Sequence, residues 1–301
     1  MSLDGGTSGL NFSEWDTATE GPLAVAFSPD SLTLYCGTPE GIQVWNTSTG
    51  RIESSISTTS PVGAVAASPD GRFLGGVAGD IKVWSPGTRE LVGTFSAGAN
   101  ANALDIAFDP VGDLLAAGCI DGTVRLLSVS AGQAAPPQVL RGHSGNVNGV
   151  AFSPDGRMLV SGGADGTARV WDIPAGRLPR VLQVGHGASS VAFDPKGRKV
   201  AAAGISGAGG GVVRIWDAST GARVADFVGT TDDTGELAFS PNGELLVSGG
   251  ATKVNVWDLA KGRVSRSSPI SDVSDVAAVS PDGRTLAVGR SDGKISVSRT
   301  L

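Results

Sequence analysis

A short motif recurs seven times along the 301-residue chain and constrains its fold more than any other feature. The motif reads Phe-Ser-Pro-Asp or a close relative, and its prolines are Pro29, Pro69, Pro110, Pro154, Pro195, Pro241 and Pro281. Successive prolines lie 40, 41, 44, 41, 46 and 40 residues apart. Such a fixed period indicates a chain built from neighbouring copies of one supersecondary unit.

The internal pattern of each repeat predicts short β-strands. Apolar residues alternate before the motif, and Ser-Pro-Asp-Gly then forms a tight turn, because Pro presets φ and Gly accepts a positive φ. A second apolar run, such as residues 158–160, leads into a Gly-rich or Asp-Gly turn that is typical of a hairpin. A third run ends in Trp, as at Trp171. Since no segment has a convincing helical period, the sequence predicts an all-β protein.

This pattern closely resembles the Trp-Asp (WD) repeat family of β-propellers, in which one repeat forms a four-stranded blade. The best copy runs from Gly142-His143 to Trp171-Asp172. Trp-Asp or a near relative closes four other repeats: Trp45-Asn46, Trp84-Ser85, Trp216-Asp217 and Trp257-Asp258. Repeats three and seven depart from the pattern, with Leu127 and Ser298 at the Trp position. The resemblance covers about residues 10–301 and implies a single seven-bladed β-propeller.

The two ends of the chain are predicted to meet in one blade. After Pro281 the sequence has room for strands over 285–289 and 294–299, but it stops without a fourth. The segment from Leu10 to Trp15 alternates and precedes the first repeat, so we predict that it forms the outer strand of the seventh blade. Residues 10–301 would then be one domain, with residues 1–9 as a flexible N-terminus or a cloning remnant.

The resemblance also implies a buried hydrogen-bond network in each complete repeat, and only repeat four has all four side chains. They are His143, Ser161, Asp165 and Trp171. A buried imidazole and a buried indole N–H each need a partner. We therefore expect Asp165 to accept from His143 and Ser161 to bridge toward Trp171. The other histidine, His186, has no such residues to pair with.

Composition and charge argue against several function classes. A net charge of −6 without a basic run argues against a nucleic-acid binder. No apolar run approaches the roughly 18 residues that span a bilayer, so no membrane partner is expected. The two cysteines, Cys36 and Cys119, are interpreted as free thiols in a reducing compartment, which favours a cytoplasmic location. Two isolated His and two isolated Cys make no convincing zinc site, so we expect no metal, no cofactor and no catalytic residue.

The family resemblance implies a rigid scaffold, not an enzyme, that binds a protein or peptide through its top face. That face carries the loops that enter each first strand and those that join the second strand to the third. We predict that the partner is basic, because acids outnumber bases among these loops. The predicted partner-binding residues are Glu20, Glu40, Asp232, Asp233, Glu236, Asp272, Asp275 and Arg290.

Two other function classes remain open at this point. One is a propeller enzyme such as a lactonase-like hydrolase, which would need a central cluster of acids, His and metal. The other is a purely structural assembly subunit. A monomer is expected unless the chain is part of a larger assembly.

Overall fold

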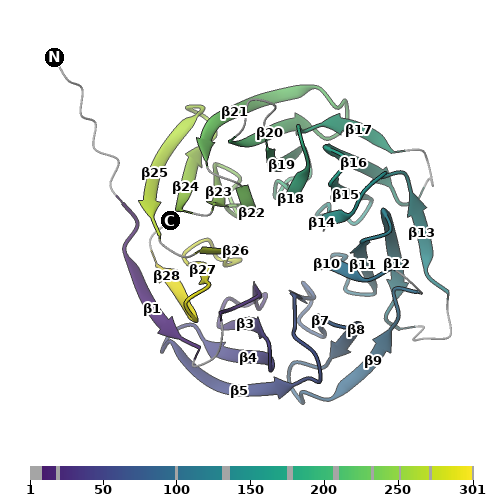
Figure 1. Cartoon of the computed structure of the whole chain (residues 1–301), viewed down its shortest axis with the longest axis vertical. Coiled ribbons are helices and arrows are strands. Elements are labelled where there is room, and N and C mark those ends of the chain that lie inside the picture. Colours follow the sequence, from purple (N-terminus) through teal and green to yellow (C-terminus); the bar gives the residue numbers. More distant parts are fainter. Residues whose placement is uncertain are drawn as a thin grey trace.

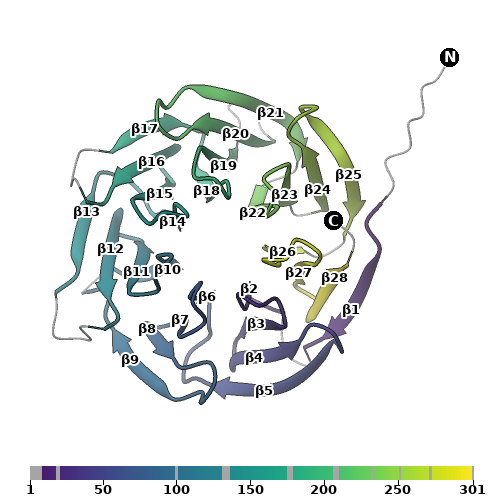
Figure 2. The same ribbon diagram turned by 180° about the vertical axis from the view of Figure 1, so that it is seen from behind.

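The computed structural model describes residues 9–17, 21–98, 101–130, 136–174, 179–205, 210–231, 234–250, 252–270 and 273–299. Seven four-stranded antiparallel sheets stand as blades around a central axis (Figure 1). The reverse view shows the same closed ring from its other face (Figure 2). This arrangement confirms the predicted seven-bladed β-propeller.

Each blade uses its strands in the same radial order. The inner strands are β2 (Ala24–Phe27), β6 (Ala64–Ala67), β10 (Ala103–Phe108), β14 (Val147–Phe152), β18 (Ala188–Phe193), β22 (Thr234–Phe239) and β26 (Val273–Val279). The second strands are β3 (Thr33–Thr38), β7 (Leu74–Ala78), β11 (Leu114–Cys119), β15 (Met158–Gly163), β19 (Lys199–Ile205), β23 (Leu245–Gly250) and β27 (Leu286–Arg290).

The third and outer strands complete the blades. The third strands are β4 (Gly41–Asn46), β8 (Asp80–Trp84), β12 (Thr123–Ser128), β16 (Thr167–Asp172), β20 (Gly211–Asp217), β24 (Lys253–Asp258) and β28 (Lys294–Ser298). The outer strands are β5 (Arg51–Ser57), β9 (Leu91–Phe95), β13 (Gln138–Arg141), β17 (Arg180–Gln183), β21 (Arg223–Thr231), β25 (Arg263–Pro269) and, in the seventh blade, β1 (Phe12–Asp16).

The Ser-Pro-Asp-Gly turns join the inner strand of each blade to its second strand. In blade four, the Ser153 hydroxyl accepts from the Met158 amide at 2.9 Å and donates to the Asp155 carboxylate at 2.6 Å. Gly156 follows with a φ of 68°, in the region that favours glycine. The motif therefore ties its own turn together through side-chain hydrogen bonds. We call the face that carries these turns the bottom face and the opposite one, where the inner strands begin, the top face.

The ring closes through the N-terminal strand, as predicted. Strand β1 pairs antiparallel with β28, in a register that runs from Phe12 opposite Ser298 to Asp16 opposite Lys294. Trp15 is buried in the apolar cluster that joins the seventh blade to the first. The first and last parts of the chain thus share one sheet, which removes the two open edges that an incomplete ring would expose.

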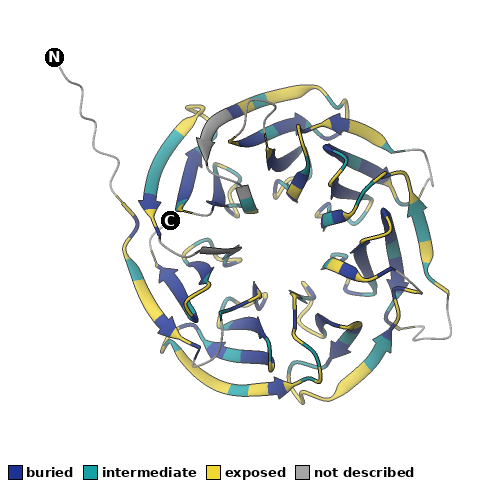
Figure 3. Ribbon diagram, viewed as in Figure 1, coloured by how far each residue is buried: buried dark blue, intermediate teal, exposed yellow. Residues whose placement is uncertain are grey.

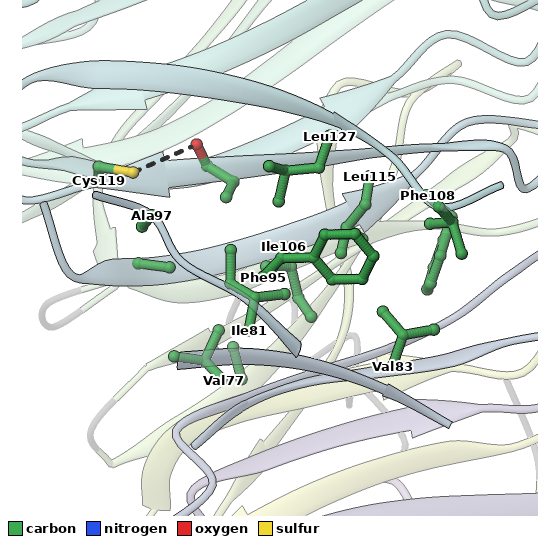
Figure 4. Packing of buried hydrophobic residues seen from close by; sticks show 14 of the residues in the cluster. Val77, Ile81, Val83, Phe95, Ala97, Ile106, Phe108, Leu115, Cys119 and Leu127 are labelled. Carbon is green, nitrogen blue, oxygen red and sulfur yellow. Dashed lines mark hydrogen bonds between the residues drawn. The ribbon is translucent and has the colours of Figure 1, made fainter. Parts of the chain in front are cut away.

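The apolar core lies between neighbouring blades. Buried residues are concentrated in the middle strands, whereas the described residues of the outer strands are mostly exposed or intermediate (Figure 3). Between blades two and three, Val83 and Phe95 pack in one cluster with Leu115 and Leu127 (Figure 4). Leu127 lies opposite Leu115, just as Trp171 lies opposite Leu159 in blade four. Leu127, which stands at the Trp position of repeat three, is therefore also apolar and packs in the core.

Candidate interaction surface on the top face and channel

The four predicted network residues of blade four lie in contact. The Nδ1 atom of His143 is 3.0 Å from Asp165 Oδ1, and its Nε2 atom is 2.8 Å from Ser161 Oγ. The indole N–H of Trp171 donates to the same hydroxyl at 2.9 Å. Because the indole can only donate, the Ser161 hydroxyl accepts from it and donates to Nε2. The remaining ring proton, on Nδ1, then donates to Asp165.

This network fixes charge as well as geometry. Burial lowers the pKa of His143, although Asp165 opposes the change, so the imidazole is neutral at pH 7. Burial disfavours the charged form of Asp165, but hydrogen bonds from Thr167, His143 and the Ser144 amide lower its pKa to about 2. The carboxylate links the loop before β14 to the turn between β15 and β16, so it holds two top-face loops together.

In two other blades the indole N–H of the Trp donates a hydrogen bond to a side chain, but the acceptor differs between them. In blade six, Trp257 donates to Ser248 Oγ at 3.0 Å. In blade one, Trp45 instead donates to Gln43 Oε1 at 3.1 Å, and Gln43 Nε2 donates to the carbonyl of Thr17 at 2.8 Å. Sequence reasoning missed this role of Gln43. The available signal was Cys36, which occupies the position that serine holds in blades four and six.

The central channel is lined at one level by an equivalent residue from all seven inner strands. The residue is the third before the Phe position of each repeat, and the channel cavity there measures about 260 Å³. The seven residues are Ala24, Ala64, Asp105, Gly149, Ser190, Glu236 and Val276. Two of the seven carry carboxylates, whereas the others are small, apolar or hydroxylic. The wall of the channel is therefore chemically asymmetric despite the regular ring.

A larger cavity opens on the top face over blades four to six. Its volume is about 460 Å³, and its lining includes exposed His186 and Ile205. Three residues line both this cavity and the channel: Asn148, Ser189 and Glu236. The two spaces therefore form one funnel, which we call the top-face funnel, from the surface over β18 to the ring of inner strands.

The predicted partner-binding acids do not all lie in loops. Glu236 is in β22 and Asp275 is in β26, both inner strands, so their assignment to top-face loops was wrong. The reason is that these strands begin earlier than the sequence pattern suggested, at Thr234 and Val273, with irregular pairing over their first residues. Glu236 consequently lines the channel.

The other predicted partner-binding residues lie in different parts of the structure or outside its described part. Glu40 is exposed in the turn between β3 and β4 of blade one, and blade seven separates that blade from Glu236 in blade six. Arg290, at the end of β27, forms ion pairs with Glu14 at 2.8 Å and Asp292 at 2.6 Å. It therefore takes part in the closure of the seventh blade. Four residues lie outside the described part of the chain: Glu20, Asp232, Asp233 and Asp272.

Comparison with known families agrees with this geometry. Six segments match the description "WD domain, G-beta repeat", at residues 50–85, 89–128, 135–172, 177–217, 221–258 and 265–297. The chain belongs to the WD40 family. Each matched segment begins with the outer strand of one blade and ends in the third strand of the next, so the WD40 sequence repeat is offset from the structural blade.

Curated relatives match this WD40 chain over limited stretches. Pre-mRNA-processing factor 19 homolog 2 of Arabidopsis thaliana is 34% identical over 107 residues, which are 36% of this chain and 19% of that protein. A periodic tryptophan protein 2 homolog of Neurospora crassa is 35% identical over 112 residues, or 36% of this chain and 12% of that protein. The homolog from Dictyostelium discoideum is 26% identical over 257 residues, or 76% of this chain and 27% of that protein. The chain thus matches roughly a quarter or less of each relative's length.

Two further findings concern the described residues alone. Within them, no group of three or more His, Cys, Asp or Glu side chains is arranged to hold a metal ion. The same part of the chain contains no helix long and apolar enough to cross a membrane.

Both cysteines are buried and unpaired, and burial raises the pKa of Cys36 to about 12, which suppresses thiolate formation.

Proposed function

We propose that this WD40 propeller is a non-catalytic module that binds a protein partner through the top-face funnel. The observation that carries the proposal is the continuity of the 460 Å³ surface cavity with the channel, through Asn148, Ser189 and Glu236. A concave site with apolar walls and a few convergent polar groups is the usual form of a binding site. The rigid blades around it would hold this shape before a partner arrives.

Exposed apolar side chains support the same face. Leu23 and Leu104 are exposed where the first and third inner strands begin, and both line the channel. Ile120 and Ile205 are exposed at the top ends of second strands. Their proximity to polar loop residues gives this face the mixed character of a transient protein interface.

The relatives are compatible with such a module. In the proteins named as pre-mRNA-processing factors and periodic tryptophan proteins, the matched stretch is a minor part of a longer chain. A propeller that serves a larger assembly by contacting other proteins fits that organisation.

Two matched variants test which face binds. Ile205→Arg would place a bulky cation at the mouth of the funnel, whereas Val111→Arg would place the same group on the bottom face, where Val111 is 66% exposed. Both variants and the parent would be expressed with an affinity tag in cells of the source organism, and the retained proteins quantified by mass spectrometry. We expect Ile205→Arg to lose partners that Val111→Arg keeps. Equal retention by the two variants would contradict binding at the top face.

A further inference from the structure

The third position before the repeat Phe has a structural role in two blades. In blade three, Asp105 Oδ2 accepts a hydrogen bond of 2.8 Å from the Val150 amide of blade four. In blade five, Ser190 Oγ accepts one of 3.1 Å from the Leu237 amide of blade six. A polar side chain at this position therefore connects one inner strand to the next around the channel. One carboxylate oxygen of Asp105 and the hydroxyl of Ser190 are therefore each used in a hydrogen bond to the next blade.

Glu236 occupies the same position in blade six and has no such contact. Among the described residues, none forms a hydrogen bond or an ion pair with its carboxyl group. Its side chain is exposed to the space of the channel, whose wall is formed by the inner strands of all seven blades. A carboxylate in this setting is not required by the fold, because smaller residues serve at the same position in Ala24, Ala64 and Gly149.

The pKa values of Asp105 and Glu236 are both raised, and the charge of Asp105 contributes to the change at Glu236. Burial raises the pKa of Asp105 to about 6. Burial, together with the negative charge of Asp105, raises the pKa of Glu236 to about 8. No Lys or Arg is among the described residues that line the channel or the cavity above it. Two carboxyl groups, from blades three and six, thus line the same channel, and no described residue of its lining supplies a compensating cation.

The walls around this pair suit a long side chain with a cationic end. Leu23 and Leu104 present exposed apolar surface at the level just above the carboxyl groups. Lys and Arg side chains pack their aliphatic stems on such surface while their charged ends reach a polar site. The wider cavity beyond Glu236, with Gly187 and Ile205 in its lining, leaves room for the backbone from which that side chain would extend.

We propose that the top-face funnel binds an Arg or Lys side chain of a protein partner, with its cationic group between the carboxylates of Asp105 and Glu236. This inference rests on the proposed function and names the chemistry of its ligand. The partner's flanking residues lie over Gly187 and Ile205, and its stem contacts Leu104. Binding supplies a counter-charge that the described lining of the channel does not provide, so it favours the ionised form of both carboxyl groups.

The experiment begins with an unbiased choice of ligand. Random nonapeptides displayed on phage would be selected on the parent propeller, and a selected peptide synthesised with a fluorescent label. A second version would carry citrulline, the neutral analogue of arginine, at any shared basic position. Binding of both versions would be measured by fluorescence anisotropy to the parent, Glu236→Gln and Asp105→Asn. Asn keeps an oxygen that can accept from the Val150 amide, so Asp105→Asn leaves the inter-blade contact possible.

A matched control separates local from general charge. Glu90→Gln removes the same charge at an exposed site between β8 and β9, away from the channel. We expect Glu236→Gln and Asp105→Asn each to weaken the arginine peptide on the order of tenfold or more, whereas Glu90→Gln leaves it unchanged. We also expect the citrulline peptide to bind the parent and Glu236→Gln equally, because the interaction that Glu236 makes is then already absent.

Several outcomes would overturn the proposal. They are a selection without a shared basic position or without any binder, unchanged affinity in Glu236→Gln, and displacement of the peptide by added Ca²⁺ or Mg²⁺, which would identify the pair as a metal site. The cell experiment distinguishes the two levels of inference. If Ile205→Arg loses partners that Glu236→Gln retains, the proposed function stands and the cation site fails. If both variants retain all partners, both fail.

Discussion

Trp15 stacks on Trp45 with ring centroids 5.6 Å apart and planes inclined by 16°. The two residues belong to different blades, because Trp15 lies on β1 in blade seven and Trp45 on β4 in blade one. The stacking therefore adds a side-chain contact across the joint where the ring closes. It also places the Trp15 ring against Gly50, where a Cβ atom would lie 2.6 Å from the indole nitrogen.

Trp15→Ala should destabilise the propeller by about 3 kcal/mol or more, because it removes a large buried side chain from the closing joint. Urea unfolding followed by circular dichroism would measure the loss. Ser13→Ala, at an exposed position of the same strand, is the control and should change the free energy of unfolding by less than about 0.5 kcal/mol. If the two variants unfold at the same urea concentration, β1 does not hold the ring closed.

The two histidines should differ in their effect on stability. His143→Ala leaves the Asp165 carboxylate and the Ser161 hydroxyl without their imidazole partner and should cost roughly 1–3 kcal/mol. His186 is exposed at the top-face funnel, so His186→Ala should cost about 0.5 kcal/mol or less. Denaturant titration of both variants gives the comparison, and equal losses would show that the His143 network adds nothing to stability.

Gln43→Leu should destabilise blade one by roughly 1–3 kcal/mol although the replacement is apolar and similar in size. The change removes the acceptor of the buried indole N–H of Trp45 and the hydrogen bond that Gln43 donates to the carbonyl of Thr17. Gln138→Leu, on the exposed outer strand β13, provides the control. Thermal unfolding of the two variants would distinguish them, and a Gln43→Leu protein as stable as the parent would contradict the assigned role.

The pH dependence of stability should change in Glu236→Gln. The pKa of Glu236 is raised from 4.5 to about 8, so the folded protein retains a proton that the unfolded chain releases between those values. Stability from this group is complete below about pH 4.5 and is lost as the pH rises toward about 8. Glu236→Gln removes this dependence, so its melting temperature should fall less than that of the parent between about pH 5 and 8.

Two other groups near this site must be controlled in that measurement. Asp105 has a raised pKa of its own, and His186 lines the cavity that Glu236 also lines. Asp105→Asn and His186→Ala should therefore be measured over the same pH range. Carbon-detected NMR of the glutamate carboxyl groups would follow Glu236 directly in the parent. If the melting temperatures of the parent and of Glu236→Gln change by the same amount between about pH 5 and 8, the pKa of Glu236 is not raised.

The ring of seven blades could be predicted from the sequence because the same turn motif and the same apolar runs occur in every repeat. Each copy of the Ser-Pro-Asp-Gly turn forms its own local hydrogen bonds, so the turn is encoded within a few residues, as at Ser153 and Asp155. The closing strand was predictable because the seventh repeat lacked an outer strand and residues 10–15 alternated. The structure places β1 where that reasoning put it.

The candidate site was less predictable because it depends on single departures from the repeat. Gln43 replaces a missing serine from a neighbouring position, which only the paired register of β3 and β4 reveals. The location of Glu236 depends on where β22 begins and on its irregular pairing with β23, and no local residue pattern marks either. Asp105 and Glu236 are far apart in sequence, and only the arrangement of the blades in a ring places both on the wall of one channel.

The pairing of β1 with β28 also sets an order of events during synthesis. Asp16 leaves the ribosome long before its partner Lys294, an interval of roughly 15 to 55 seconds at about 5–20 residues per second. Until then β1 has no strand to pair with, although Trp15 can already stack on Trp45 of blade one. Backbone pairing can therefore fix β1 in the ring only after β28 has been made, so closure of the seventh blade comes after the assembly of the blades that precede it.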